Sequence, residues 1–137
     1  MIKPRELTLD QKRAKYAWDR VQKNQKFEKS YVNFTKSAPS FIMSNGLMQA
    51  LAFYQSRKKN DEAAGAIVVD IIEWLSLQSP QQFSSPSFES GMKCLYSMPS
   101  ESYMQATCET LAMLRWLRQF ADALKKDDST ESVGESR

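Results

Sequence analysis

Apolar residues recur at helical spacing along most of this chain, and that periodicity restricts its fold more than any other feature. Ala14, Ala17, Trp18 and Val21 follow the i, i+3, i+4, i+7 pattern that forms one apolar stripe on an α-helix. The same spacing returns farther along, at Leu47, Ala50, Leu51 and Tyr54. A chain of 137 residues is long enough for one domain with a hydrophobic core. We therefore predict an all-α fold, a compact single-domain bundle of about six helices.

Capping residues and helix breakers set the expected boundaries in the first half of the chain. The expected helices cover about residues 10–28, 29–36 and 47–58, with one further apolar turn at 40–44. Thr8 or Asp10 is the expected N-cap of the first helix. Pro39 is expected to interrupt the helical pattern, and Asn45-Gly46 is typical of a left-handed helix stop.

The second half predicts three more helices, at about residues 61–78, 88–97 and 101–126, with a Ser/Pro-rich connector at 79–87. Asn60 or Asp61 is the expected N-cap of the first of these. Residues 66–72 are rich in Ile and Val and could form a strand by propensity alone. The length of the segment and the absence of partner strands favour a buried helix. Residues 1–126 are thus expected to form the helical domain, and 127–137 an acidic, disordered tail.

Composition excludes several classes of enzyme. The chain contains no histidine, four glycines without phosphate-loop spacing, and only two cysteines, Cys94 and Cys108. Imidazole catalysis, Cys/His zinc sites and glycine-rich nucleotide loops are therefore ruled out. Asp70 and Glu73 lie one helical turn apart and could contribute to a Mg²⁺-dependent nuclease, but a polar stripe on that helix is the favoured interpretation. We expect no catalytic residues, no metal and no cofactor.

The start of the chain is charged and lacks the apolar core of a signal peptide, which predicts a cytoplasmic protein. Residues 37–56 carry no charge, but their serines, Pro39 and Asn45-Gly46 indicate buried helices and a turn, so no membrane association is expected. In a reducing compartment Cys94 and Cys108 are expected to be small buried hydrophobes.

Charge is distributed unevenly along the chain. Residues 1–60 hold 13 Lys and Arg against 4 Asp and Glu, a net charge of +9, whereas residues 61–137 hold 6 against 12, a net charge of −6. This polarity suggests one face for a polyanion and another face for a different contact.

The first helix concentrates the positive charge. Lys12, Arg13, Lys15, Arg20, Lys23 and Lys26 fall on one broad face opposite the apolar stripe, with Tyr16 and Phe27 among them. Asp19 is the only acid between Lys12 and Lys26, whereas an ordinary solvated helix face mixes both signs. This pattern favours contact with a nucleic-acid backbone over a purely solvated surface. The predicted contact residues are Lys12, Arg13, Lys15, Arg20 and Lys23, with Arg57, Lys58 and Lys59 as a second group.

The last helix is apolar around much of its circumference. It is expected either to lie wholly inside the bundle or to present Met113, Trp116 or Phe120 to a partner protein, and the sequence does not decide between the two.

Three segments, taken in order, resemble a known family. The first is Gln11-Lys12-Arg13-Ala14-Lys15-Tyr16-Ala17. The second comprises Tyr31, Ala38-Pro39, Ile42 and Asn45-Gly46-Leu47-Met48-Gln49-Ala50-Leu51-Ala52-Phe53. The third comprises Tyr103, Ala106-Thr107, Glu109, Leu111, Leu114-Arg115-Trp116-Leu117 and Phe120-Ala121. Together they resemble the small all-helical subunit, the fifth Cmr subunit, of type III-B CRISPR effector complexes. The resemblance spans about residues 9–125 and is lost in the Ser/Pro-rich connector and the acidic tail.

The resemblance implies a non-catalytic structural subunit in antiviral defence. In that family several copies stack head to tail beside the backbone subunits, along the paired guide and target RNA, while other subunits cleave. The implied partners are the backbone and large Cmr subunits, guide RNA, target RNA and further copies of this chain. Opposite charge in the two halves of the chain would favour such head-to-tail contact.

The alternative is a freestanding helical nucleic-acid-binding regulator. A helix-turn-helix protein places its base-reading helix second, after a short turn, whereas the densest basic helix of this chain comes first. A nuclease is a third class, and it would require Mg²⁺-dependent RNA cleavage by the subunit alone.

Overall fold

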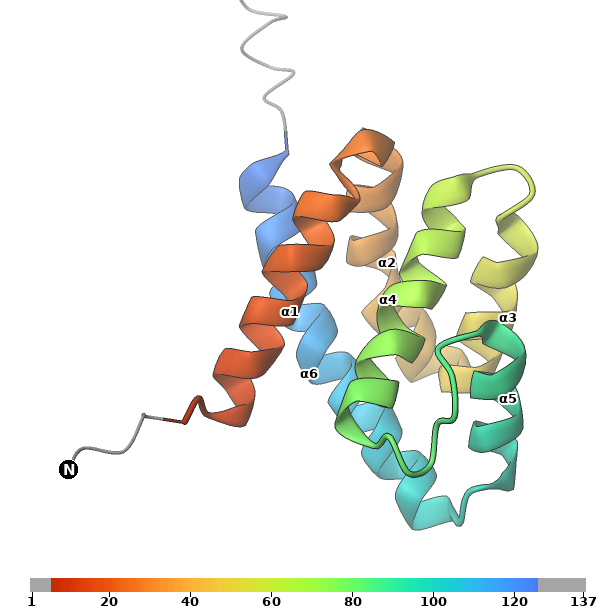
Figure 1. Cartoon of the computed structure of the whole chain (residues 1–137). Coiled ribbons are helices and arrows are strands. Elements are labelled where there is room, and N and C mark those ends of the chain that lie inside the picture. Colours follow the sequence, from red (N-terminus) through yellow and green to blue (C-terminus); the bar gives the residue numbers. More distant parts are fainter. Residues whose placement is uncertain (1–5, 126–137) are drawn as a thin grey trace, which may run out of the picture.

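The computed structural model describes residues 6–125, which contain six α-helices and one short 3-10 turn (Figure 1). The helices are α1 (Leu9–Lys23), α2 (Glu28–Asn45), α3 (Leu47–Arg57), α4 (Glu62–Gln78), α5 (Phe88–Ser97) and α6 (Ser100–Leu124), and the 3-10 turn covers Gln25–Phe27. No strand occurs in residues 6–125. The predicted all-α bundle is confirmed, and residues 66–72 are helical.

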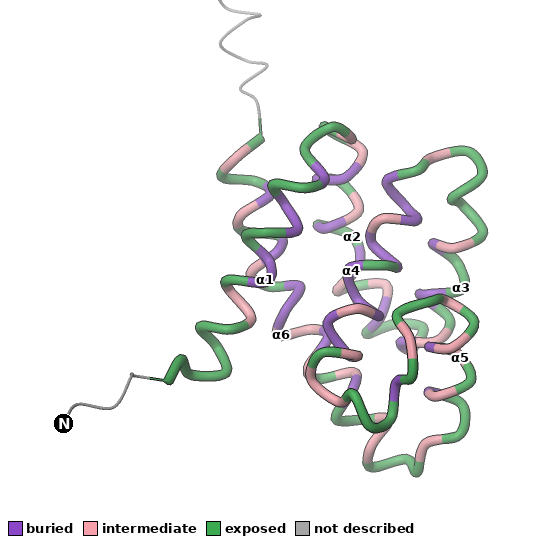
Figure 2. The backbone as a smooth tube through the Cα atoms, in the orientation of Figure 1, coloured by how far each residue is buried: buried purple, intermediate pink, exposed green. Residues whose placement is uncertain are grey.

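Helix α4 is the most enclosed element of the bundle. Eight of its apolar side chains are buried: Ala63, Ala64, Ile67, Val68, Ile71, Ile72, Trp74 and Leu75. Figure 2 shows this buried stretch running down the middle of the molecule, where α4 packs against α2, α3, α5 and α6. A helix that is apolar around most of its surface is stable only inside a protein, which explains why α4 is central.

Consecutive long helices run antiparallel, so the connections alternate between two ends of the bundle (Figure 1). The α1–α2 and α3–α4 connections lie at one end, together with the C-terminus of α6. The α2–α3 and α5–α6 connections lie at the opposite end. This alternation brings residues that are distant in sequence onto the same end.

Local capping signals are confirmed where they were strongest. Thr8 caps α1 in a reciprocal capping box: its hydroxyl accepts from the Gln11 amide at 3.1 Å, and its amide donates to the Gln11 side chain at 2.8 Å. Asp61 caps α4 by accepting from the Ala63 amide at 3.0 Å. Gly46 ends α2 with φ of +89°, a conformation that side chains with a Cβ rarely adopt.

Two expected boundaries in the first half are wrong. Helix α1 ends at Lys23 rather than near residue 28, because the chain turns through a 3-10 segment and Asn24 is buried against α4. Pro39 does not interrupt a helix but lies inside α2. Ala38 and Ile42, on either side of the proline, are buried in the core. Their packing maintains the helix despite the backbone hydrogen bond that proline cannot donate.

The apolar side chains around α6 are partly buried in the core and partly accessible at its surface. Met113, Leu114 and Leu117 are buried, so Met113 belongs to the core and not to a partner surface. Trp116 and Phe120 are half-buried and lie in an aromatic cluster at the α1–α6 contact.

The two cysteines do not share one environment. Cys94 is half-buried, whereas Cys108 is exposed on α6, so the expected burial of Cys108 is wrong.

None of the helices in residues 6–125 is long and apolar enough to cross a membrane. The acidic segment 127–137 lies outside the described residues.

Candidate nucleic-acid interface

The basic residues of α1 separate into two groups in the structure. Lys12, Lys15 and Lys23 are exposed, as the predicted phosphate-binding face requires. Arg13 and Arg20 instead point into contacts with α6 and α4. The helical wheel placed all five on one polar face, but it could not show which side chains meet acids on neighbouring helices.

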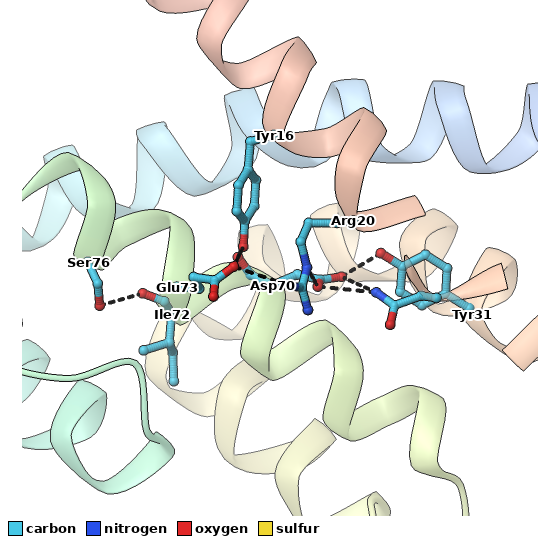
Figure 3. Close-up of polar contacts among 8 residues, drawn as sticks. Tyr16, Arg20, Tyr31, Asp70, Ile72, Glu73 and Ser76 are labelled. Carbon is cyan, nitrogen blue, oxygen red and sulfur yellow. Dashed lines mark hydrogen bonds and ion pairs between the residues drawn. The ribbon is translucent and has the colours of Figure 1, made fainter. Parts of the chain in front are cut away.

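Arg20 is 7% exposed and belongs to a buried polar network centred on Asp70, which is 0% exposed. The Arg20 guanidinium binds the Asp70 carboxylate through Nε, and Glu73 through Nη1 at 3.2 Å. Tyr31 donates its hydroxyl to Asp70, and the Asn24 amide lies 3.3 Å from both carboxylate oxygens. Figure 3 shows these side chains converging on α4. The prediction that Arg20 lies on the exposed basic face is therefore wrong.

Tyr16 is a second correction on the same helix. It was expected among the exposed bases, yet it is 9% exposed, and its hydroxyl donates to the Asp70 carbonyl at 2.7 Å (Figure 3). Burial, reinforced by the nearby Asp70 charge, raises the pKa of the Tyr16 phenol. Asp70 and Glu73 are likewise not a solvated polar stripe, because both carboxylates are engaged by Arg20.

The pKa of Asp70 reflects its enclosure. Burial raises it to about 6, because removal from water outweighs the lowering by Arg20, Tyr31 and Asn24. Asp70 is therefore still ionised at neutral pH, where it forms a buried ion pair with Arg20. Every buried side-chain polar atom in residues 6–125 has a hydrogen-bond partner. The network is therefore fully satisfied and holds α1, α2 and α4 together.

Arg13 forms a second inter-helix contact. Its guanidinium makes a bidentate pair with Glu109 of α6, at 2.7 Å from Nε and 2.8 Å from Nη2. The same carboxylate accepts from the indole of Trp74 at 2.9 Å. The Arg13 side chain is 19% exposed, so most of it is committed to the α1–α6 contact. A phosphate would have to displace the Glu109 carboxylate to accept hydrogen bonds from Nε and Nη2 of Arg13.

The uneven charge along the sequence does not map directly onto two separate faces. Four ion pairs in the described part of the chain join the basic first half to the acidic second half: Arg13–Glu109, Arg20–Asp70, Arg20–Glu73 and Lys36–Asp122. Because helices from both halves pack side by side, part of the apparent polarity is neutralised within the fold. The half-chain charges therefore do not by themselves define the face for a polyanion and the face for a different contact, and that inference stays a prediction.

A concentrated basic surface nevertheless remains at one end of the bundle. The "basic end" comprises Lys23, Lys26, Arg57, Lys58 and Lys59, all exposed in or beside the α1–α2 and α3–α4 connections, which lie at the same end in Figure 1. The same connections contain three carboxylates, Glu28, Asp61 and Glu62. Asp61 is already occupied as the cap of α4.

The cations of this surface differ in how far they are held in place. Lys26 lies over the Phe27 ring at 5.1 Å, and Arg57 over the Phe53 ring at 5.7 Å, which orients both cations while leaving them exposed. Lys12, Lys23, Lys58 and Lys59 form no ion pair with any residue between 6 and 125. At the basic end the ammonium groups of Lys23, Lys58 and Lys59 are thus available for an anion, as is that of Lys26, which lies over the Phe27 ring.

Chemically, the exposed ammonium groups of this surface can bind phosphates. In residues 6–125 no group of three or more His, Cys, Asp and Glu side chains could hold a metal ion. Asp70 and Glu73, the carboxylates considered for a nuclease, are already engaged by Arg20. Flexible lysines on helices and turns contact a nucleic-acid backbone without reading its sequence.

The buried network around Asp70 is the feature that the sequence analysis missed. The signal was a single acid inside the apolar run Ala66–Ile72, at a position that shares its helix face with Ile67 and Trp74. An acid on a buried face requires a cation from another element. The sequence does not say which of the many bases supplies it.

Comparison with known proteins identifies a matching family and a similar relative. The model of a family described as "CRISPR-associated protein (Cas_Cmr5)" matches residues 9–124, from the start of α1 to the end of α6. The CRISPR system Cmr subunit Cmr5 of Thermus thermophilus is 29% identical over 119 residues, which covers 85% of this chain and 96% of that relative. The family match therefore includes every helix of the bundle.

Proposed function

Because the chain belongs to the Cmr5 family of CRISPR-associated proteins, we propose that it is a non-catalytic structural subunit of a type III-B RNA-guided complex in antiviral defence. In this proposal, copies of the chain stack in a short filament along the paired guide and target RNA. Each copy contacts the RNA backbone through exposed lysines. The observation that carries the proposal is the family match across the entire helical body.

The structure supports a revised set of RNA contacts. We retain Lys12, Lys15 and Lys23 on α1, because their side chains are exposed. The second group predicted from the sequence, Arg57, Lys58 and Lys59, now has the same weight as the α1 lysines, because the fold brings these residues to the same end as Lys23. Arg13 and Arg20 are left out, because their guanidinium groups hold helices together. An A-form duplex is recognised by its backbone and shape, which separated point charges can match.

Head-to-tail stacking is supported by the difference between the two ends of the bundle. Opposite the basic end, an "apolar end" exposes Met43, Tyr96 and Met104 at 76%, 65% and 66%. The Tyr103 hydroxyl accepts from the Met48 amide at 3.0 Å, which ties the start of α6 to the start of α3 at this end. Two unlike ends favour a heterologous contact, which repeats along an axis without closing.

Self-association is expected to depend on salt if the charged end takes part in it. Sedimentation of the purified full chain should give a smaller average mass at about 1 M salt than at about 0.1 M, because added ions screen exposed charges. If the mass distribution is the same at both salt concentrations, the electrostatic form of the stacking proposal is wrong.

Purification from the native host tests the proposal as a whole. The tagged chain is expected to elute with other Cmr subunits and with small guide RNAs. A variant with Lys12, Lys23 and Lys58 changed to Glu should retain its helical circular-dichroism spectrum and elute with less RNA. A monomer that elutes with neither protein nor RNA would contradict the proposal. Loss of binding to selected RNA sequences only would instead support the freestanding regulator.

A further inference from the structure

Lys58 of the basic end lies against a glycine on the next helix. Gly65 is buried near the start of α4, and Lys58 is the C-cap residue that follows α3. A methyl group added at Gly65 would lie 2.8 Å from Cγ and 2.9 Å from Cδ of Lys58, and 3.3 Å from its Cε. The aliphatic stem of the lysine therefore occupies the space that any larger residue at position 65 would need.

Backbone conformation does not explain the glycine. Gly46 is the only glycine in residues 6–125 with positive φ, so Gly65 adopts ordinary helical geometry that alanine would also accept. Glycine in a helix is less favourable than alanine, because it loses more conformational freedom on folding. The close approach of Lys58 is the feature of this structure that accounts for a missing side chain at position 65.

We propose that Gly65 is a positioning residue for RNA binding: it seats the stem of Lys58 so that the ammonium group is held at the basic end. This inference rests on the proposed function, since it assumes that Lys58 contacts RNA phosphates. A lysine loses considerable rotamer freedom when it is fixed against a ligand. A stem that is already seated loses less, which favours the bound state.

RNA binding tests this role. The probe is a fluorescently labelled RNA duplex of mixed sequence, titrated with full-length variants at low salt. Gly65→Ala is expected to weaken binding about fivefold, the scale of one ordered side chain, and Lys58→Ala by at least as much. The double variant should bind no more weakly than Lys58→Ala alone, because the glycine acts only through the lysine. Lys93→Ala, which removes an exposed lysine from α5, is the control and should bind like the wild type.

Thermal unfolding of the same variants tests the seat without RNA. In the Lys58→Ala background, Gly65→Ala should raise Tm by about 3 °C, because alanine is the better helix former and nothing obstructs its methyl group. In the wild-type background the gain should be smaller, because the methyl group must displace the Lys58 stem. The same Tm shift in both backgrounds would overturn the proposed seat.

The two measurements separate this inference from the proposed function. If Lys58→Ala weakens RNA binding and Gly65→Ala does not, the positioning role is wrong and the RNA contact stands. If the Tm shifts depend on Lys58 but Lys58→Ala binds RNA like the wild type, the seat exists without a role in binding. That outcome overturns the positioning role and removes Lys58 from the proposed contact set.

Discussion

Arg20→Met is expected to destabilise the fold by about 3–5 kcal/mol at neutral pH, because it leaves Asp70 charged in the core without its cation. The pKa of Asp70 is already raised to about 6 with Arg20 in place, because burial outweighs the lowering by Arg20 and the other hydrogen-bond donors. Loss of Arg20 raises that pKa further, so folding at neutral pH requires either a buried unpaired charge or the protonation of Asp70, and both cost free energy. Urea denaturation followed by circular dichroism measures the free energy of unfolding.

The pH dependence of this variant has a definite sign. The folded-state pKa of Asp70 lies above its unfolded value of 3.8, so stability from this group decreases as the pH rises through the folded pKa. Because the folded pKa is higher in Arg20→Met than in the wild type, the gap between the two proteins should narrow as the pH falls from about 8 to about 6.

Lys15→Met is the matched control on the same helix. Lys15 pairs with Asp19 at 2.9 Å, but the two side chains are 70% and 57% exposed. Such an exposed pair contributes less than about 1 kcal/mol. The double variant Arg20→Met/Asp70→Asn, which removes both buried charges, should recover most of the stability. If Arg20→Met unfolds at the same urea concentration as Lys15→Met, the structural role assigned to Arg20 is wrong.

Removing three lysines from the basic end is the second large effect. The variant Lys23→Gln/Lys58→Gln/Lys59→Gln is expected to bind duplex RNA more weakly by on the order of a hundredfold at about 0.1 M salt. The slope of log affinity against log salt should become shallower by about 2–3, because fewer counterions are released on binding when fewer phosphates are contacted. Titration at several salt concentrations, with two unrelated RNA sequences, measures both quantities.

Equal removal of charge elsewhere controls for net charge. Lys93→Gln/Arg115→Gln/Arg118→Gln takes three exposed cations from α5 and α6 and should weaken binding much less. An equal loss in both triple variants would show that total charge, and not the basic end, determines RNA affinity. A loss confined to one of the two RNA sequences would contradict backbone recognition.

Much of the fold could be predicted because its determinants are local. The caps at Thr8 and Asp61 and the stop at Gly46 depend on residues within one helical turn, and all three are confirmed. Helix α5 begins and ends at the predicted residues, between a Ser/Pro-rich connector and a proline. The family resemblance is confirmed as well, because it rests on ordered segments that span the chain.

The errors occur where contacts between distant residues override a local signal. Pro39 is a helix breaker in isolation, yet the buried neighbours Ala38 and Ile42 hold α2 continuous through it. Tyr16 and Arg20 share a helical face with exposed lysines, yet both turn toward the polar groups of α4. The family resemblance could not correct these predictions, because matching sequence segments do not show which side chains contact each other.

The sequence by itself determined the helical fold and the family of the chain. It also determined that the chain has many Lys and Arg residues and no histidine. These properties follow from composition and from patterns repeated every few residues. Only the tertiary structure decided which bases face water. Arg20 meets Asp70 across 50 positions of sequence and Arg13 meets Glu109 across 96, so both pairings exist only once the helices pack. The same packing brings Lys23 and Lys58 to one end, because antiparallel helices return the chain there.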